Sequence, residues 1–169
     1  FAAYGVPPRS RFPGYHSSVF YQKAYARNEW LQSLCYIVMA VNYRLGIGYG
    51  SAFHRAANAG ANGDSEYRDV LAAGKYLQSR PDVDRNRIGI WGLSYGGILT
   101  SEALARNSDI FAAGFDMAAV NLWGSNLDTA SVSYKSSAIS AIDKWTSPVQ
   151  VWQGDADRNV ALSQSSGPD

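Results

Sequence analysis

The segment Arg87-Ile88-Gly89-Ile90-Trp91-Gly92-Leu93-Ser94-Tyr95-Gly96-Gly97 is the most informative part of the sequence. Residues 92–96 match the pattern Gly-x-Ser-x-Gly, in which a serine lies on a tight turn between a strand and a helix. Glycines are needed because the strained turn leaves no room for neighbouring side chains and because the strand and the helix approach closely. An apolar run precedes the pattern, and a helical pattern over Tyr95–Arg106 follows it. This context makes Ser94 a candidate nucleophile, lifted above the edge of a sheet.

Strand and helix patterns alternate on both sides of this segment. Apolar runs predict four strands, at residues 35–41, 87–91, 113–117 and 149–152, and residues 1–5 resemble part of another. Helices are predicted before Leu34 and at residues 64–79, 95–106 and 131–145. This alternation indicates one α/β domain with a mostly parallel sheet and helices on both faces.

The clearest helical pattern runs from Asp64 to Ser79. Its apolar positions recur at three- and four-residue spacing and so share one face; they are Tyr67, Val70, Leu71, Gly74 and Leu77. Asp64 or Ser65 can cap the start of this helix, and Pro81 follows its end. The loop before it, at residues 44–63, is long for a compact domain, and long ordered loops are more often functional than idle.

The composition excludes several classes of protein. Only 17% of the 169 residues are charged, which argues against a disordered chain, and the net charge of +1 comes without the basic clusters that nucleic-acid binding requires. No run approaches the roughly 18 apolar residues of a membrane span. The single cysteine, Cys35, excludes an intrachain disulfide and lies in an apolar run, as expected for a buried thiol. The only histidines are His16 and His54, so a metal centre built from several histidines is poorly supported.

A serine hydroxyl becomes a good nucleophile only when a base takes its proton and a carboxylate orients that base. With this motif the expected chain order is serine, then acid, then histidine. Asp155 and Asp157 follow the predicted strand at residues 149–152, so both are candidate acids. Asp116 is a weaker candidate, because a position inside a strand suits a polar residue held by local hydrogen bonds.

Neither histidine fits the role of the base. His16 and His54 both precede Ser94, which breaks the expected order. His54 lies in the long loop after a predicted strand, where active sites of parallel sheets form, and is interpreted as solvent-exposed or substrate-lining. His16 is interpreted as a surface residue.

Several segments, in order along the chain, resemble the catalytic domain of the prolyl oligopeptidase family. They are Asn42-Tyr43-Arg44 with Gly48-Tyr49-Gly50, then residues 92–97, then Ser147-Pro148 and Gly154-Asp155-Ala156-Asp157-Arg158-Asn159-Val160. The nearer branch is the dipeptidyl peptidase IV and acylaminoacyl peptidase type. The resemblance implies an α/β-hydrolase fold and a serine peptidase that hydrolyses short peptides through an acyl-enzyme on Ser94. It implies a peptide as partner and neither metal nor organic cofactor, and it leaves the oligomeric state open.

The resemblance also implies roles for the catalytic groups. Asp157 matches the family's catalytic aspartate, because it precedes Arg158-Asn159-Val160 at the family's spacing, and Asp155 is the second choice. The backbone N–H of Tyr95 matches the first donor to the oxyanion. Tyr4, in Tyr4-Gly5-Val6-Pro7, matches a tyrosine whose hydroxyl is the second donor, although Val6 replaces a usual glycine.

Further positions match the family's substrate pocket. The residues that match its apolar primary specificity pocket are Tyr95, Val120, Trp123 and Val160. Asn159 matches a residue that holds a backbone carbonyl of the substrate. A pocket framed by aromatic rings suits proline or another compact apolar side chain. Val120 and Val160 can equally be plain core residues.

The family's histidine follows its aspartate by a few tens of residues, and this sequence ends at Asp169. We therefore expect residues 1–169 to be one catalytic domain truncated at both ends, without its last strand and helix, and inactive by itself. Two alternatives stay open. One is an α/β-hydrolase of the esterase or lipase type, and the other is a non-catalytic hydrolase-like binding module.

Overall fold

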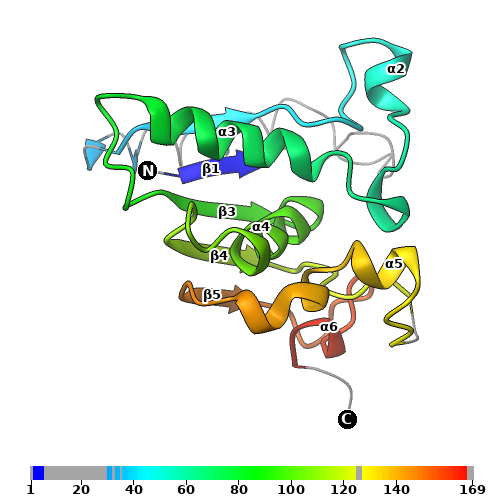
Figure 1. Cartoon of the computed structure of the whole chain (residues 1–169). Helices are drawn as coiled ribbons and strands as arrows, with labels where there is room; N and C mark the ends of the chain where they lie inside the picture. The colour runs from blue at the N-terminus through cyan, green and yellow to red at the C-terminus, as the bar shows by residue number, and fades with distance from the viewer. Residues whose placement is uncertain (1, 6–29, 32, 35, 125–126, 167–169) are drawn as a thin grey trace.

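The computed structural model describes residues 2–5 (as backbone only), 30–31, 33–34, 36–124 and 127–166. Within these residues the sheet has five strands, β1 (Ala2–Gly5), β2 (Val38–Val41), β3 (Gly89–Leu93), β4 (Ala113–Met117) and β5 (Val149–Trp152). They lie in the order β2-β1-β3-β4-β5, and every pairing between neighbours is parallel (Figure 1). The predicted α/β class with a parallel sheet is confirmed. The carboxyl ends of all five strands therefore meet at one edge.

Two long helices cover one face of this sheet. They are α3 (Tyr67–Ser79) and α4 (Tyr95–Arg106), and both lie in front of the strands in Figure 1. Their buried apolar side chains pack with the strand residues Val41 and Ile90, and with Ile88 just before β3, in one core cluster. Four of the five residues predicted for the apolar face of α3 are buried: Tyr67, Val70, Gly74 and Leu77. Leu71 is half-buried, and Ala73 is also buried.

The opposite face of the sheet carries a smaller cluster. Ile90 and Trp91 are neighbours along β3 and so point to opposite faces, and Trp91 is buried with Met117 of β4. Leu31 packs against this pair, and it lies in the helical segment expected before Leu34, most of which is outside the described residues.

The other helices that begin and end within residues 36–124 and 127–166 are short. They are α2 (Ser51–His54), α5 (Val132–Lys135) and α6 (Ser163–Ser166), with 3₁₀ turns η2 (Gly60–Asn62) and η3 (Ala138–Lys144). Among the described residues, no helix combines the length and the apolar character that crossing a membrane requires.

Two helix predictions were wrong in detail. The helix expected from Asp64 begins only at Tyr67, because Asp64 has a φ of 51° and pairs with Arg106 instead of capping α3. The helix expected at residues 131–145 is broken into α5 and η3. The Ser137 side chain explains the break. Its hydroxyl donates to the Ser133 backbone carbonyl and accepts the backbone N–H of Trp123, so it competes with regular helical bonding.

Strand β5 is the edge strand of the described sheet, and its side chains are largely exposed to solvent. All four of its residues are exposed, Trp152 to 58%. Trp152 contacts Phe115 of β4 edge-to-face, with ring centres 4.8 Å apart.

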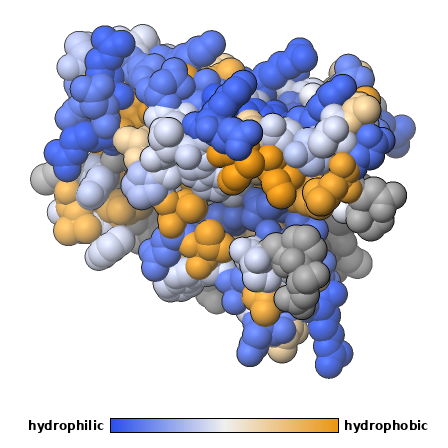
Figure 2. Space-filling view, turned by 60° about the horizontal axis from the view of Figure 1, so that its bottom comes forward, coloured by the Kyte–Doolittle hydropathy of each residue, from blue (hydrophilic) through white to orange (hydrophobic). Residues whose placement is uncertain are grey.

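Figure 2 shows hydrophobic residues as separate patches between hydrophilic ones on the face turned to the viewer. Strands β2 and β3 also differ from their predicted limits, since β2 begins at Val38 and β3 runs on to Leu93.

Candidate active site

Ser94 occupies the turn between β3 and α4, with φ 57° and ψ −116°. Two glycines make this turn possible. A Cβ at Gly92 would collide with the backbone of Gly96, and a Cβ at Gly97 would lie 2.7 Å from Oδ1 of Asp116. The Ser94 N–H donates to the Met117 carbonyl at 2.8 Å, which ties the turn to the end of β4. The strand–turn–helix geometry predicted for residues 92–96 is present, and the Ser94 side chain is half-buried.

Asp157 lies in the loop after β5, at the same edge of the sheet as Ser94. Its Oδ1 accepts the N–H groups of Asn159, at 2.8 Å, and Val160, at 3.1 Å, and Gln153 donates to Oδ2 at 3.3 Å. These N–H groups hold the pKa of Asp157 below its ordinary value. The carboxylate is therefore ionised at neutral pH, as the acid of a catalytic triad must be.

The other two acids differ from Asp157. Asp155 is exposed and follows β5 in the same loop. Asp116 is 1% exposed inside β4, where Ser101 donates to it at 2.8 Å and Asn121 at 3.3 Å. Burial raises its pKa. Asp116 is thus the locally hydrogen-bonded strand residue that the sequence favoured.

The ring of Tyr95 lies among polar and aromatic groups. It stacks on Tyr43, with centres 6.0 Å apart, and is tilted against Trp123 at 6.2 Å. Its hydroxyl donates a short hydrogen bond to Oε1 of Glu66. Tyr95 and Trp123, both predicted for the specificity pocket, are therefore in contact, and Glu66 joins them although the sequence pattern did not single it out.

The other predicted pocket residues lie on separate segments, after β4 and after β5. Val120 follows β4 and is half-buried, Val160 is 8% exposed, and Asn159 beside it is exposed. A depression of about 510 Å³ lies at the carboxyl ends of β3, β4 and β5. Its lining does not include these residues and consists of Leu93, Met117, Ala118, Val151, Trp152, Gln153 and Gly154.

The two predicted oxyanion donors lie on neighbouring elements. The Tyr95 N–H opens α4, where the first N–H groups of a helix have no partner within it. Tyr4 pairs with Trp91 in register, so its backbone lies beside the strand that leads to Ser94. Its side chain and Val6 fall outside the described residues.

The histidines give no base for Ser94 in the described part of the chain. His54 lies at the end of α2, and its Nδ1 is 3.0 Å from the carbonyl oxygen of Leu45 in its own loop. His16 and Cys35 lie outside the described residues. Within the described ranges, no three acidic, histidine or cysteine side chains are grouped so that they could hold a metal ion.

The sequence model of the prolyl oligopeptidase family matches residues 22–132, which is more than half of the chain. The chain belongs to the prolyl oligopeptidase family. The resemblance noted in the sequence is thereby confirmed.

Curated relatives in this family are much longer than the chain. Dipeptidyl peptidase 4 of Trichophyton equinum is 34% identical over 121 residues, covering 72% of this chain and 15% of that protein. Dipeptidyl peptidase 8 of Homo sapiens is 39% identical over 100 residues, 59% of this chain and 11% of that protein. The chain spans about one seventh or less of the length of these relatives.

Solved structures of the family share its fold. The dipeptidyl peptidase 4 of Porphyromonas gingivalis superposes with a TM-score of 0.74 at 25% identity, over 98% of this chain and 24% of that one. An acylaminoacyl peptidase of Pyrococcus horikoshii gives 0.73 at 24% identity, over 97% and 28%. The fold is that of an α/β-hydrolase.

The family motif Asn42-Tyr43-Arg44 has a structural role next to the site. Arg44 forms an ion pair with Asp69 of α3 at 3.0 Å, and its N–H donates to the same carboxylate at 2.9 Å. Tyr43, at 1% exposure, lies under the Tyr95 ring. The motif thus fixes the loop after β2 to α3 and supports the residue that follows Ser94.

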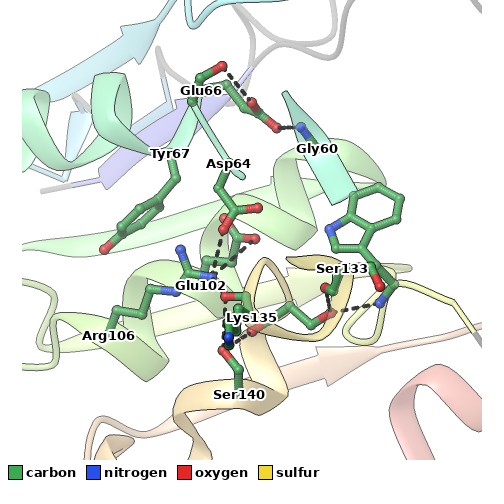
Figure 3. Close-up of polar contacts among 12 residues, drawn as sticks. Gly60, Asp64, Glu66, Tyr67, Glu102, Arg106, Ser133, Lys135 and Ser140 are labelled. Atoms are coloured by element: carbon green, nitrogen blue, oxygen red, sulfur yellow. Dashed lines mark hydrogen bonds and ion pairs between the residues drawn. The ribbon is translucent and has the colours of Figure 1, made fainter. Parts of the chain in front are cut away.

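A buried cluster of charged residues was missed at the sequence level. Arg106 of α4 pairs with Asp64 at 2.8 Å, lies 4.0 Å from Glu102, and donates to the Lys135 carbonyl at 3.0 Å (Figure 3). Burial raises the pKa of Asp64 to about 6 and also raises that of Glu102, which lies beside Asp64. The spacing of Glu102 and Arg106 by four residues on one helix was the available signal.

Proposed function

We propose that the protein is a serine peptidase that cleaves short peptides through an acyl-enzyme on Ser94. The observation that carries this proposal is the strained, glycine-lined turn that presents Ser94 at the carboxyl edge of the sheet. Asp157, an ionised carboxylate, lies at that same edge. Membership of the prolyl oligopeptidase family and relatives named dipeptidyl peptidases support the peptide as substrate.

The proposed reaction is acyl transfer in two steps. The Ser94 oxygen attacks the carbonyl carbon of the scissile bond while a base takes the hydroxyl proton, and that proton then goes to the leaving amine. Water attacks the resulting ester in the same way and frees the acid. The Tyr95 N–H, together with the Tyr4 hydroxyl, stabilises the oxyanion, and such donors are each worth about 3–4 kcal/mol of barrier.

The base is assigned to neither histidine of this sequence. Both precede Ser94, and His54 Nδ1 faces the Leu45 carbonyl. Asp157 is assigned to orient the imidazole of the base and to stabilise its cationic form.

The pocket for the residue before the scissile bond is assigned to Tyr95, Trp123, Val120 and Val160, with Asn159 holding a substrate carbonyl. Contact between the rings of Tyr95 and Trp123 supports this assignment. Such a wall suits a proline-sized or similarly compact apolar side chain.

The test uses the full-length protein with three chromogenic substrates: a dipeptide p-nitroanilide ending in proline, an acetylated amino-acid p-nitroanilide and a p-nitrophenyl ester. We expect amide turnover that Ser94→Ala abolishes and that Asp157→Asn lowers by about 10⁴-fold in kcat. A fluorophosphonate should label the wild type and not Ser94→Ala. Ser79→Ala, which changes an exposed serine on α3, is the matched control.

Two results would reject the proposal. Ester hydrolysis without amide hydrolysis would favour the esterase alternative. A folded protein that neither reacts with the fluorophosphonate nor turns over any substrate would favour a binding module.

A further inference from the structure

Glu66 is a buried carboxylate to which the proposed mechanism gives no role. It is 2% exposed and ends the loop that leads into α3. Its Oε1 accepts the Gly60 N–H at 2.9 Å and the Tyr95 hydroxyl, and Ser65 donates to Oε2 at 3.4 Å. Figure 3 shows the carboxylate directed at the Gly60 amide. Since burying a charge is costly unless hydrogen bonds replace water, these donors hold Glu66 in one position.

The Tyr95 ring is held on several sides at once. Tyr43 stacks on it nearly parallel, at 17°, and Trp123 is tilted against it at 52°. Gly60 closes a further side, because a Cβ there would lie only 3.1 Å from the Tyr95 hydroxyl oxygen. Among these contacts, the bond to Glu66 is the one that fixes the end of the ring. Without the Glu66 carboxylate, the half-buried Tyr95 hydroxyl and the buried Gly60 N–H would both lose their acceptor.

The backbone of Tyr95 is held by different contacts. The turn before it is fixed by the bond from the Ser94 N–H to the Met117 carbonyl, at 2.8 Å, and by the bond from the Ile98 N–H to the Ser94 carbonyl, at 3.0 Å. Gly92 packs against the backbone of the same turn. A change at Glu66 therefore acts on the ring of Tyr95 and leaves its N–H and Ser94 in place.

We propose that Glu66 is a positioning residue for substrate specificity: by holding the Tyr95 hydroxyl, it fixes the Tyr95 ring as a wall of the primary pocket and restricts that pocket to compact apolar side chains. This inference rests on the proposed peptidase function. Burial and the adjacent Glu66 carboxylate raise the pKa of Tyr95, so the hydroxyl keeps the proton that it donates under all assay conditions.

The test compares the full-length wild type with Glu66→Ala, Glu66→Gln and Tyr95→Phe. Two dipeptide p-nitroanilides are used, one with proline and one with phenylalanine before the scissile bond, and kcat and KM are measured for each. The rate of labelling by a small alkyl fluorophosphonate, which has no group for the pocket, is measured in parallel. Asp143→Asn, at an exposed acid on η3, is the control.

We expect Glu66→Ala to lower the proline-to-phenylalanine ratio of kcat/KM by about tenfold, mainly through a higher KM for the proline substrate. Labelling by the fluorophosphonate should stay within about twofold of the wild type. Tyr95→Phe should lower the ratio similarly, and the two changes combined should not add, because they remove the same bond. Glu66→Gln retains an acceptor oxygen and should restore most of the ratio.

An unchanged ratio in folded Glu66→Ala would overturn the inference. Equal losses in labelling and in both substrates would overturn it too, since they would show that Glu66 supports the turn at Ser94 instead of the ring. If Glu66→Ala does not fold, an unchanged ratio in Tyr95→Phe decides against the inference. A wild type with neither labelling nor turnover would reject the proposed function itself, and that result differs from all of the others.

Discussion

Replacing Asp64 with asparagine tests the buried charge cluster through its effect on stability. The Asp64 side chain is 8% exposed and pairs with Arg106 at 2.8 Å. The carboxyl groups of Glu66 and Glu102 also affect the pKa of Asp64. Desolvation raises its pKa from 3.8 to about 6 in the folded protein. In the unfolded chain its pKa returns to the ordinary value. The two states therefore bind different numbers of protons between about pH 4 and pH 6.

The sign of the effect follows from this difference. Below about pH 4 the carboxyl is protonated in both states, and its contribution to the free energy of unfolding is fully present. As the pH rises through about 6, the folded state must hold a buried anion, and that contribution is lost. A pKa change from 3.8 to about 6 corresponds to about 3 kcal/mol. The asparagine side chain of the Asp64→Asn variant cannot titrate, so the stability of the variant relative to the wild type should rise by up to that amount between pH 4 and pH 7.

The assay is urea denaturation, followed by tryptophan fluorescence, at pH 4, 5, 6 and 7. The quantity compared is the variant's free energy of unfolding minus that of the wild type, so that an offset constant in pH does not matter. Asp143→Asn changes an exposed acid and should give a flat difference. A flat or falling difference for Asp64→Asn would refute the argument. Loss of the Asp64 charge also lowers the pKa of Glu102, and this change has the same sign.

Three further predictions concern stability by urea denaturation. Gly92→Ala should lower the free energy of unfolding by about 3 kcal/mol or more, or prevent folding, because the new Cβ would collide with the Gly96 backbone. Gly154→Ala is the control and should change the midpoint little, because the nearest atom to its Cβ would be 3.8 Å away. Leu104→Ala should cost about 2–5 kcal/mol, because this side chain is fully buried. Arg80→Ala should leave the midpoint unchanged, because the ion pair of Arg80 is exposed and adds nothing measurable.

Elements whose limits depend on local sequence could be predicted residue by residue. Strands β4 and β5 and helix α4 have the predicted bounds. For β5 and α4, a proline, glycine or polar residue lies directly before or after the apolar run or helical pattern. The start of α3 could not be predicted this way. Asp64 leaves the helix because its partner Arg106 lies 42 positions away, and no local pattern contains that pair.

The same distinction holds for the candidate site. Ser94, the Tyr95 N–H and Asp157 belong to short motifs, so their types and spacing identify them in the sequence. Glu66 belongs to no such motif. Its partner Tyr95 is 29 positions away, and the contact exists only because the loop after β2 folds back onto the start of α4. Sequence reasoning therefore found the groups proposed for the chemistry and missed Glu66, which holds the side-chain ring of Tyr95.

Residues of the short segment from Asp64 to Asp69 bind the first and the last residue of α4. Glu66 binds Tyr95 at the first residue of α4, and Asp64 binds Arg106 at its last. Asp69 binds Arg44 and so joins the same segment to the loop after β2. The two contacts on α4 lie at opposite ends of a helix of 12 residues, about 18 Å long, and only the first adjoins Ser94. Titration of Asp64 should therefore alter the stability of the fold without altering specificity, and substitution of Glu66 should alter specificity at every pH.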